Sequence, residues 1–248
     1  KIGPQLKAHK TAVNNLTLAF PDMPETEKQR ILTGMWDNLG RVAAELPHLP
    51  GETLHARMTV AGEEHFPVHG TQVIFISGHL GNWELTYPTL FKRGIQTALV
   101  YRRANNPFVD KLIARLRATR CTALVPKGPA GAIKLVRAIK DGQSLAMLVD
   151  QKMNDGISVP FFGREAMTAP AVAQFALKYN LPILPACIVR THGAYFKGTL
   201  FPPLAYEKTG DEARDILTVM TEINRLLESW IRAYPEQWFW VHKRWPNS

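Results

Sequence analysis

The stretch "VIFISGHLGNWE" (residues 73–84) changes from a continuous apolar run to a turn rich in glycine and polar side chains. A short apolar run of this kind predicts a buried strand, and Gly78 and Gly81 permit a tight turn after it. Five steps along an α-helix rotate by roughly 140°, so His79 and Glu84 would not share a face of one helix. We therefore place His79 in the turn and Glu84 in the first turn of the following helix.

Further apolar runs follow this stretch, and segments with helical periodicity separate them. The predicted buried strands are "VIFI", "TALVY", "ALVP", "SLAMLV" and "PILPACIV", and the predicted helices lie near residues 83–93, 107–119, 130–140 and 168–179. This alternation predicts an α/β fold with a layered, largely parallel sheet flanked by helices. Apolar residues at helical spacing also predict an N-terminal helical part within residues 1–50 and a long C-terminal helix over 216–230. We expect a single domain over residues 1–248.

Composition narrows the classes of function. The chain has 248 residues, of which 46% are hydrophobic, so it can bury a substantial core. Its two cysteines, Cys121 and Cys187, have no ligand spacing, and we expect no cysteine-based metal site. No apolar run is long enough to span a bilayer. The sequence begins at Lys1 rather than Met, and we expect a leading segment, such as a membrane anchor, to be missing from it.

The positive charge is concentrated in one segment. The net charge is +9, and residues 99–140 hold ten Lys or Arg but a single acid, Asp110. The rest of the chain is balanced. Such asymmetry indicates an anionic partner such as nucleic acid, an acidic lipid surface or an acidic protein, although a solvated helix face would give the same pattern.

His79 and Glu84 could form a catalytic pair. Sites in open α/β sheets form at the carboxyl ends of strands, which is where His79 is predicted to lie. Glu84 could then reach back to one imidazole nitrogen while the other faces outward. Such a carboxylate fixes the tautomer, favours the imidazolium, and makes His79 a competent general base. The competing interpretation is an ordinary loop histidine, with Glu84 complementing the dipole of its helix.

Four segments in order extend this pattern. They are "GHLGNWE", "VYRRANNP", "VDQKMNDGISVPFFG" and "PEQWFWVHKRW". Together with "TGMWDNLGR" they resemble the bacterial lipid A biosynthesis acyltransferases of lauroyl type, which belong to the lysophospholipid acyltransferase superfamily. The resemblance runs from about Lys1 to Trp245. It implies a single acyltransferase domain with a glycerol-3-phosphate acyltransferase-like fold, and in the native protein an N-terminal membrane anchor.

The resemblance also implies a reaction. A fatty acyl group would pass from an acyl thioester, carried by acyl carrier protein, to the hydroxyl of a 3-hydroxyacyl chain on a phosphorylated glucosamine disaccharide, the lipid A precursor. His79 would be the base and Glu84 would orient and charge it, without an enzyme nucleophile, a cofactor or a metal. The enzyme would work on the anionic surface at the cytoplasmic face of the cell inner membrane, and no nucleic acid would be involved.

Further residues match the family's blocks. We expect Arg102 to stabilise the developing oxyanion, with Arg103 as its substitute. We assign substrate binding or shaping of the site to Lys127, Asp150 and Gln151. "VPFFG" (159–163) resembles a substrate-side loop, or else forms a buried aromatic turn.

Other interpretations stay open on the sequence alone. The closing "WFWVHKRW" (238–245) could anchor at a membrane interface or pack as a strand, and we do not take His242 as a ligand. An acyltransferase acting on a lysophospholipid or a phosphoinositide mannoside would share the same chemistry. A basic anion- or nucleic-acid-binding domain would explain the charge but gives "GHLGNWE" no role. A hydrolase is disfavoured because no G-x-S-x-G motif is present.

Overall fold

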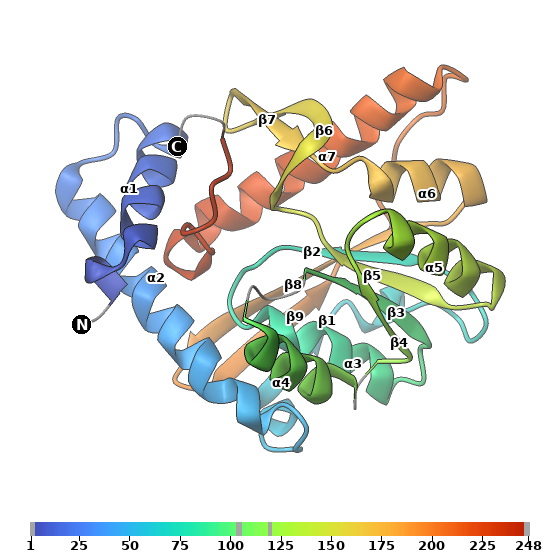
Figure 1. Cartoon of the computed structure of the whole chain (residues 1–248), viewed down its shortest axis with the longest axis horizontal. Coiled ribbons are helices and arrows are strands. Elements are labelled where there is room, and N and C mark those ends of the chain that lie inside the picture. The colour runs from blue at the N-terminus through green and yellow to red at the C-terminus, as the bar shows by residue number, and fades with distance from the viewer. Residues whose placement is uncertain (1–2, 103–105, 119–120, 246–248) are drawn as a thin grey trace.

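The computed structural model describes residues 3–102, 106–118 and 121–245 (Figure 1). Its α-helices are α1 (Lys7–Ala19), α2 (Glu25–Glu45), α3 (Thr86–Lys92), α4 (Pro107–Ala118), α5 (Pro129–Lys140), α6 (Ala171–Tyr179) and α7 (Glu212–Ala233). Its strands are β1 (Met58–Ala61), β2 (Ile74–Ser77), β3 (Thr97–Tyr101), β4 (Ala123–Pro126), β5 (Ser144–Leu148), β6 (Lys152–Phe161), β7 (Arg164–Thr168), β8 (Ile183–His192) and β9 (Tyr195–Leu200).

Within the described residues, a seven-stranded sheet has the order β1-β9-β8-β2-β5-β3-β4. Neighbouring strands within this sheet run parallel, except for β8 and β9, which are antiparallel. β2 lies near the middle, beside β5 on one edge and β8 on the other. The predicted layered α/β fold with a largely parallel sheet and preceding helices is confirmed.

Alternate residues of the central strands face two apolar layers, because successive side chains of a strand point to opposite faces. Ile74 and Ile76 of β2 join the larger core cluster, which also contains residues of α1, α2, α5, α6 and α7. Phe75 points the other way and packs in a smaller cluster with Tyr87 and Leu90 of α3. A strand buried on both faces reads as a continuous apolar run, which is why the sequence revealed β2.

Four strands of the fold, β1, β6, β7 and β9, were not predicted from the sequence. β6 and β7 form an antiparallel hairpin outside the main sheet, and "VPFFG" (159–163) is its turn region rather than a separate loop. β6 was missed because its first half is polar and exposed at Asn154 and Asp155. Phe161 and Phe162 are buried, as the buried-turn interpretation has it.

The C-terminal segment 238–245 is neither a membrane-interface anchor nor a strand of the sheet. Trp238, Trp240 and Trp245 are each at most 3% exposed, so these rings are out of reach of a lipid surface. Arg244 is completely buried, donates to Met167 O and Thr168 Oγ1, and lies over the Phe161 ring. The aromatic residues therefore fill the core beneath the β6–β7 hairpin.

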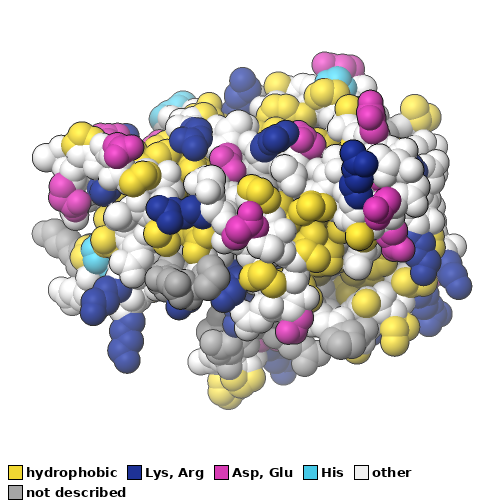
Figure 2. Space-filling view, turned by 90° about the horizontal axis from the view of Figure 1, so that it is seen from above, with side chains coloured by type: hydrophobic (Ala, Val, Ile, Leu, Met, Phe, Trp, Pro, Cys, Tyr) yellow, Lys and Arg dark blue, Asp and Glu magenta, His cyan; other side chains and the backbone are white. Residues whose placement is uncertain are grey.

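Helix lengths and surface charge complete the description. In the part of the chain that the structure covers, every helix is too short or too polar to serve as a membrane span. The face seen from above in Figure 1, where α7 and the β6–β7 hairpin lie, carries acidic and basic side chains interspersed (Figure 2).

Candidate active site

His79 lies in the turn that follows β2, at the carboxyl end of the parallel sheet. A short 3₁₀ helix, η5 (Trp83–Leu85), begins directly after the turn, and the Asn82 side-chain oxygen accepts from the Glu84 backbone N–H at its start. Gly81 has φ +56°, and a Cβ there would come within 2.3 Å of Ile188 O. Only glycine allows the turn to pack this closely against β8.

The carboxylate of Asp150 holds His79 at two points. Asp150 Oδ1 is 2.7 Å from His79 Nδ1, and Oδ2 accepts the His79 backbone N–H at 2.7 Å. Trp238 Nε1 also donates to Oδ2, at 2.8 Å. The parallel pairing of β2 and β5 brings His79 and Asp150 together. Ser77 of β2 is in register with Leu148 of β5, His79 lies two positions after Ser77, and Asp150 lies two positions after Leu148.

Electrostatics fix the tautomer of His79. Burial alone would raise the pKa of Asp150, but the charge of His79 and the hydrogen bonds from His79 and Trp238 outweigh burial and lower that pKa from 3.8 to about 2. Asp150 is therefore ionised and can only accept, so Nδ1 of His79 carries a proton. This ionisation also stabilises the fold above about pH 4, and that contribution disappears as the pH falls through about 2.

The second ring nitrogen, Nε2, is left for chemistry. Gln151 Nε2 lies 3.4 Å from it, a separation longer than that of a good hydrogen bond. The rings of Trp83 and Phe239 lie 5.1 Å and 5.7 Å from the imidazole, and the side chain of His79 keeps 16% of its surface exposed. In neutral His79, Nε2 is thus an accessible proton acceptor in a mostly apolar surrounding.

Glu84 does not take the place predicted for it beside the imidazole. Both of its carboxylate oxygens accept from Arg117 of α4, and Trp83 Nε1 donates to one of them at 3.1 Å. The side chains are 4% and 15% exposed, for Glu84 and Arg117 respectively. Burial would lower the pKa of Arg117, but the hydrogen bond and charge of Glu84 raise it. The predicted contact is wrong because Asp150 occupies Nδ1 and the η5 helix turns Glu84 toward α4.

The predicted substrate-binding cations lie at the carboxyl ends of β3 and β4. Both Arg102 and Lys127 are exposed. They directly follow Tyr101 and Pro126, which are in register, so the two cations leave neighbouring strands at the same level. Although Lys127 as a whole residue is exposed, loss of hydration around its ammonium group, and then the charge of Arg102, lower its pKa. Arg103 lies outside the described residues. Gln151 is the neighbour of Asp150, so four of the five predicted substrate-binding residues share the carboxyl edge with His79.

The structure adds Trp238 and Phe239, which the sequence had assigned to an anchor or a strand. Phe239 N donates to His79 O at 3.0 Å, and Trp238 donates to Asp150. No local pattern identifies these contacts, because they join residues about 90 to 160 positions apart. The nearby imidazole of His242 has its pKa lowered to about 4, mainly by burial, so His242 is a poor proton acceptor at neutral pH.

Comparison with known proteins places the chain in a family. A family model described as "Bacterial lipid A biosynthesis acyltransferase" matches residues 2–247. The lipid A biosynthesis lauroyltransferase of Escherichia coli is 26% identical over 244 residues, covering 93% of this chain and 76% of the relative. Lipid A biosynthesis acyltransferase 2 of Shigella flexneri is 23% identical over 248 residues, covering 96% and 77%.

A solved structure gives a weaker likeness. The 1-acyl-sn-glycerophosphate (LPA) acyltransferase of Thermotoga maritima matches with a TM-score of 0.42 and 13% identity, over 90% of this chain and 95% of that one. That likeness is too distant to support an argument about the site. The family model covers nearly the whole sequence, including the turn that carries His79 and Glu84, and the chain therefore belongs to the bacterial lipid A biosynthesis acyltransferases.

Proposed function

We propose that the protein is a late acyltransferase of lipid A biosynthesis. It transfers a fatty acyl group from an acyl thioester, carried by acyl carrier protein, to the hydroxyl of a 3-hydroxyacyl chain on a phosphorylated glucosamine disaccharide. The observation that carries the proposal is the His79–Asp150 pair, which leaves Nε2 available at the carboxyl end of β2 in a chain of this family.

The reaction is a single displacement. Nε2 of His79 takes the proton of the acceptor hydroxyl while the hydroxyl oxygen attacks the thioester carbonyl carbon. Arg102 is proposed to stabilise the oxyanion that forms on the carbonyl oxygen. Collapse of the tetrahedral intermediate breaks the C–S bond, and the proton on Nε2 passes to the departing thiolate. Asp150 holds the imidazole in the required tautomer, and Glu84 is proposed to act through Arg117 and the turn rather than on the ring.

The direct test uses cells that lack the gene for this protein and then regain it. We expect the lipid A of the deleted strain to be lighter by one acyl group in mass spectra, and the mass to return on complementation. Complementation with His79→Ala is the matched control and should fail. If lipid A were unchanged and the purified protein acylated a lysophospholipid, the acceptor would instead be a lysophospholipid. Parallel assays with carrier-protein and coenzyme A thioesters identify the donor.

Cysteine chemistry is not expected to contribute. Burial raises the pKa of Cys121 to about 11, against a smaller lowering by Arg117, and burial raises that of Cys187 to about 12. Both thiols are therefore protonated and poorly nucleophilic at neutral pH. We predict that Cys121→Ala with Cys187→Ala keeps most of the activity and that donor alone leaves no stable acyl group on the protein. A Cys121 acyl peptide that disappears on adding acceptor would contradict the single displacement.

We also propose that the protein works on the anionic surface at the cytoplasmic face of the inner membrane, with α4 as a contact. Phe108 and Leu112 of α4 are 83% and 57% exposed. Lys111 and Arg115 are exposed beside them, and the spacing of these four residues puts them on one helix face. An apolar strip flanked by cations is suited to an acidic lipid interface. Arg117, on the other side of α4, is engaged with Glu84 and is not available to lipid.

This surface gives a salt-dependent prediction. Lys111→Glu with Arg115→Glu should weaken sedimentation with anionic vesicles and raise the KM for the lipid acceptor more than it lowers kcat. The effect should fade at high salt, because exposed charges are screened over about 8 Å at physiological ionic strength. Arg214→Glu with Arg225→Glu, on α7 at the opposite side of Figure 1, makes the same change in net charge and serves as the control. Equal loss in both variants would show that α4 has no special role. Arg120, in the same basic segment, lies outside the described residues.

A further inference from the structure

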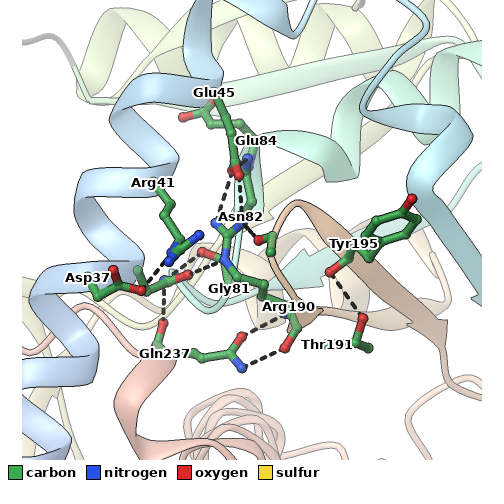
Figure 3. Close-up of polar contacts among 12 residues, drawn as sticks. Asp37, Arg41, Glu45, Gly81, Asn82, Glu84, Arg190, Thr191, Tyr195 and Gln237 are labelled. Carbon is green, nitrogen blue, oxygen red and sulfur yellow. Dashed lines mark hydrogen bonds and ion pairs between the residues drawn. The ribbon is translucent and has the colours of Figure 1, made fainter.

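A buried ion pair lies behind the turn that carries the site. Arg190, near the end of β8, pairs with Glu45 at the end of α2 through two bonds, Nη1 to Oε1 at 2.5 Å and Nη2 to Oε2 at 3.0 Å. The two side chains are 8% and 11% exposed. Arg190 Nε also donates to Asn38 Oδ1 at 3.0 Å. The pair joins the N-terminal helical part of the chain to the central sheet (Figure 3).

The pair connects to the site through Asn82, which lies between His79 and Glu84 in the sequence. Asn82 Nδ2 donates to Glu45 Oε2 at 2.7 Å, and Asn82 Oδ1 accepts from the Glu84 backbone N–H at 3.2 Å. Asn82 is 1% exposed, so water does not compete for either bond. Figure 3 shows Glu45 directed toward both Arg190 and Asn82. The amide of Asn82 is therefore held at both ends.

The backbone of the turn is held by the same elements. Gly81 O accepts from Asn38 Nδ2 at 2.9 Å, and Gly81 N donates to Gln237 O at 3.1 Å. The side chain of Gln237, in the short helix η6 (Pro235–Gln237), accepts from Arg190 N at 2.7 Å and donates to Arg190 O at 2.9 Å. Three elements distant in sequence thus fix a turn of a few residues.

General stabilisation does not explain this arrangement well. Desolvating two charges is costly, and well-packed apolar side chains commonly stabilise a fold at least as much as a buried ion pair. What an apolar pair could not do is present a carboxylate oxygen to the amide of Asn82. Two parallel bonds from Arg190 fix the direction of that oxygen.

We infer that Glu45 and Arg190 are positioning residues for the reaction. Through Asn82 they fix the turn that sets His79 against Asp150 and starts the η5 helix at Glu84. The N-terminal helix α2 is thereby part of the catalytic apparatus. This inference rests on the proposed transferase function, in which small displacements of the base are costly because turnover depends on near-attack geometry.

The test uses isosteric changes. Glu45→Gln leaves an NH₂ group facing either Arg190 or Asn82, which both donate to the carboxylate at position 45. Asn82→Asp puts two carboxylates face to face. Each variant is expected to lower kcat by about 10- to 100-fold with little change in KM, because a displacement of the order of 1 Å costs up to about 100-fold. The double variant should recover much of the loss, since the amide at position 45 can donate to the carboxylate at position 82.

A control separates positioning from stability. Asp215 is 5% exposed and accepts from Thr209 and Gly210, at the start of α7. Asp215→Asn also removes a buried carboxylate, and we expect it to lower the melting temperature without lowering kcat of the folded protein. If the position-45 and position-82 variants lost activity only in proportion to their folded fraction, or if the double variant behaved as the sum of the singles, the positioning role would be overturned.

A readout without substrate distinguishes this inference from the proposed function. The imidazole nitrogen resonances of His79, assigned with His79→Ala, report how the ring sits against Asp150. We expect Glu45→Gln to shift them and Asp215→Asn to leave them in place. Unshifted resonances with full turnover would overturn the positioning role. A wild-type protein that transfers no acyl group to a lipid A precursor would instead overturn the proposed function, whatever the resonances show.

Discussion

His79→Ala is expected to lower turnover by about 10²- to 10⁴-fold, the usual contribution of a positioned general base. The reason is that Nε2 of His79 is the nitrogen left without a strong partner once Asp150 holds Nδ1. The measurement is kcat for acyl transfer with purified protein, together with a melting curve. The fold should survive the change, because the backbone N–H at position 79 and Trp238 Nε1 still donate to Asp150 and the ring already keeps 16% of its surface exposed.

The matched control for this prediction is His192→Ala. That imidazole lies at the end of β8, is exposed and stacks on Tyr195. It carries the same chemical group and should leave kcat unchanged. Near-normal turnover by a folded His79→Ala protein would rule out general-base catalysis by this residue.

Asp150→Asn is expected to cost on the order of 10²-fold or more in kcat, because the base would carry its proton on the wrong nitrogen. His79 N and Trp238 Nε1 both donate to Oδ2, so the amide oxygen must take that place. The new NH₂ group then faces Nδ1 as a donor. Nδ1 has to accept, which moves the imidazole proton to Nε2 and leaves no lone pair for the acceptor hydroxyl. Nitrogen resonances of the ring should show the change of tautomer directly.

Glu84→Ala provides the contrast with Asp150→Asn. Removing Glu84 leaves Arg117 buried without its carboxylate, and breaking such a pair typically costs about 3–5 kcal/mol. The Glu84→Ala variant should therefore lose activity together with a lower melting temperature, and the tautomer of His79 should stay unchanged. If Glu84→Ala changed the tautomer and Asp150→Asn did not, Glu84 would be the partner of the imidazole after all.

The pairing of these carboxylates explains where reasoning from the sequence failed. Glu84 lies five positions from His79, and proximity along the chain suggested that it was the partner. Asp150 lies 71 positions away, after a different strand. The carboxyl ends of parallel neighbours meet at one edge, but nothing in the sequence states that β5 is the neighbour of β2. That order requires the chain to pass β3 and β4 and then return to the centre of the sheet.

The sequence by itself determined the local features. Continuous apolar runs indicated the central strands, since a strand buried on both faces needs no polar alternation. Gly78 and Gly81 indicated the turn, and the position of His79 after a strand indicated the edge at which the site lies. The resemblance that led to the family was also local, because it depended on short segments in a fixed order. Each of these properties depends on neighbouring residues alone.

Tertiary structure decided the partners. Asp150 on His79, Arg117 on Glu84 and Glu45 on Asn82 each join elements separated by 33 to 71 positions. It also decided that the tryptophans of segment 238–245 fill the core instead of meeting a membrane. A polar or aromatic side chain can satisfy its hydrogen bonds or bury its surface against many partners. Only the strand order and the helix packing select among them, because they set which chain segments come within about 3 Å of one another.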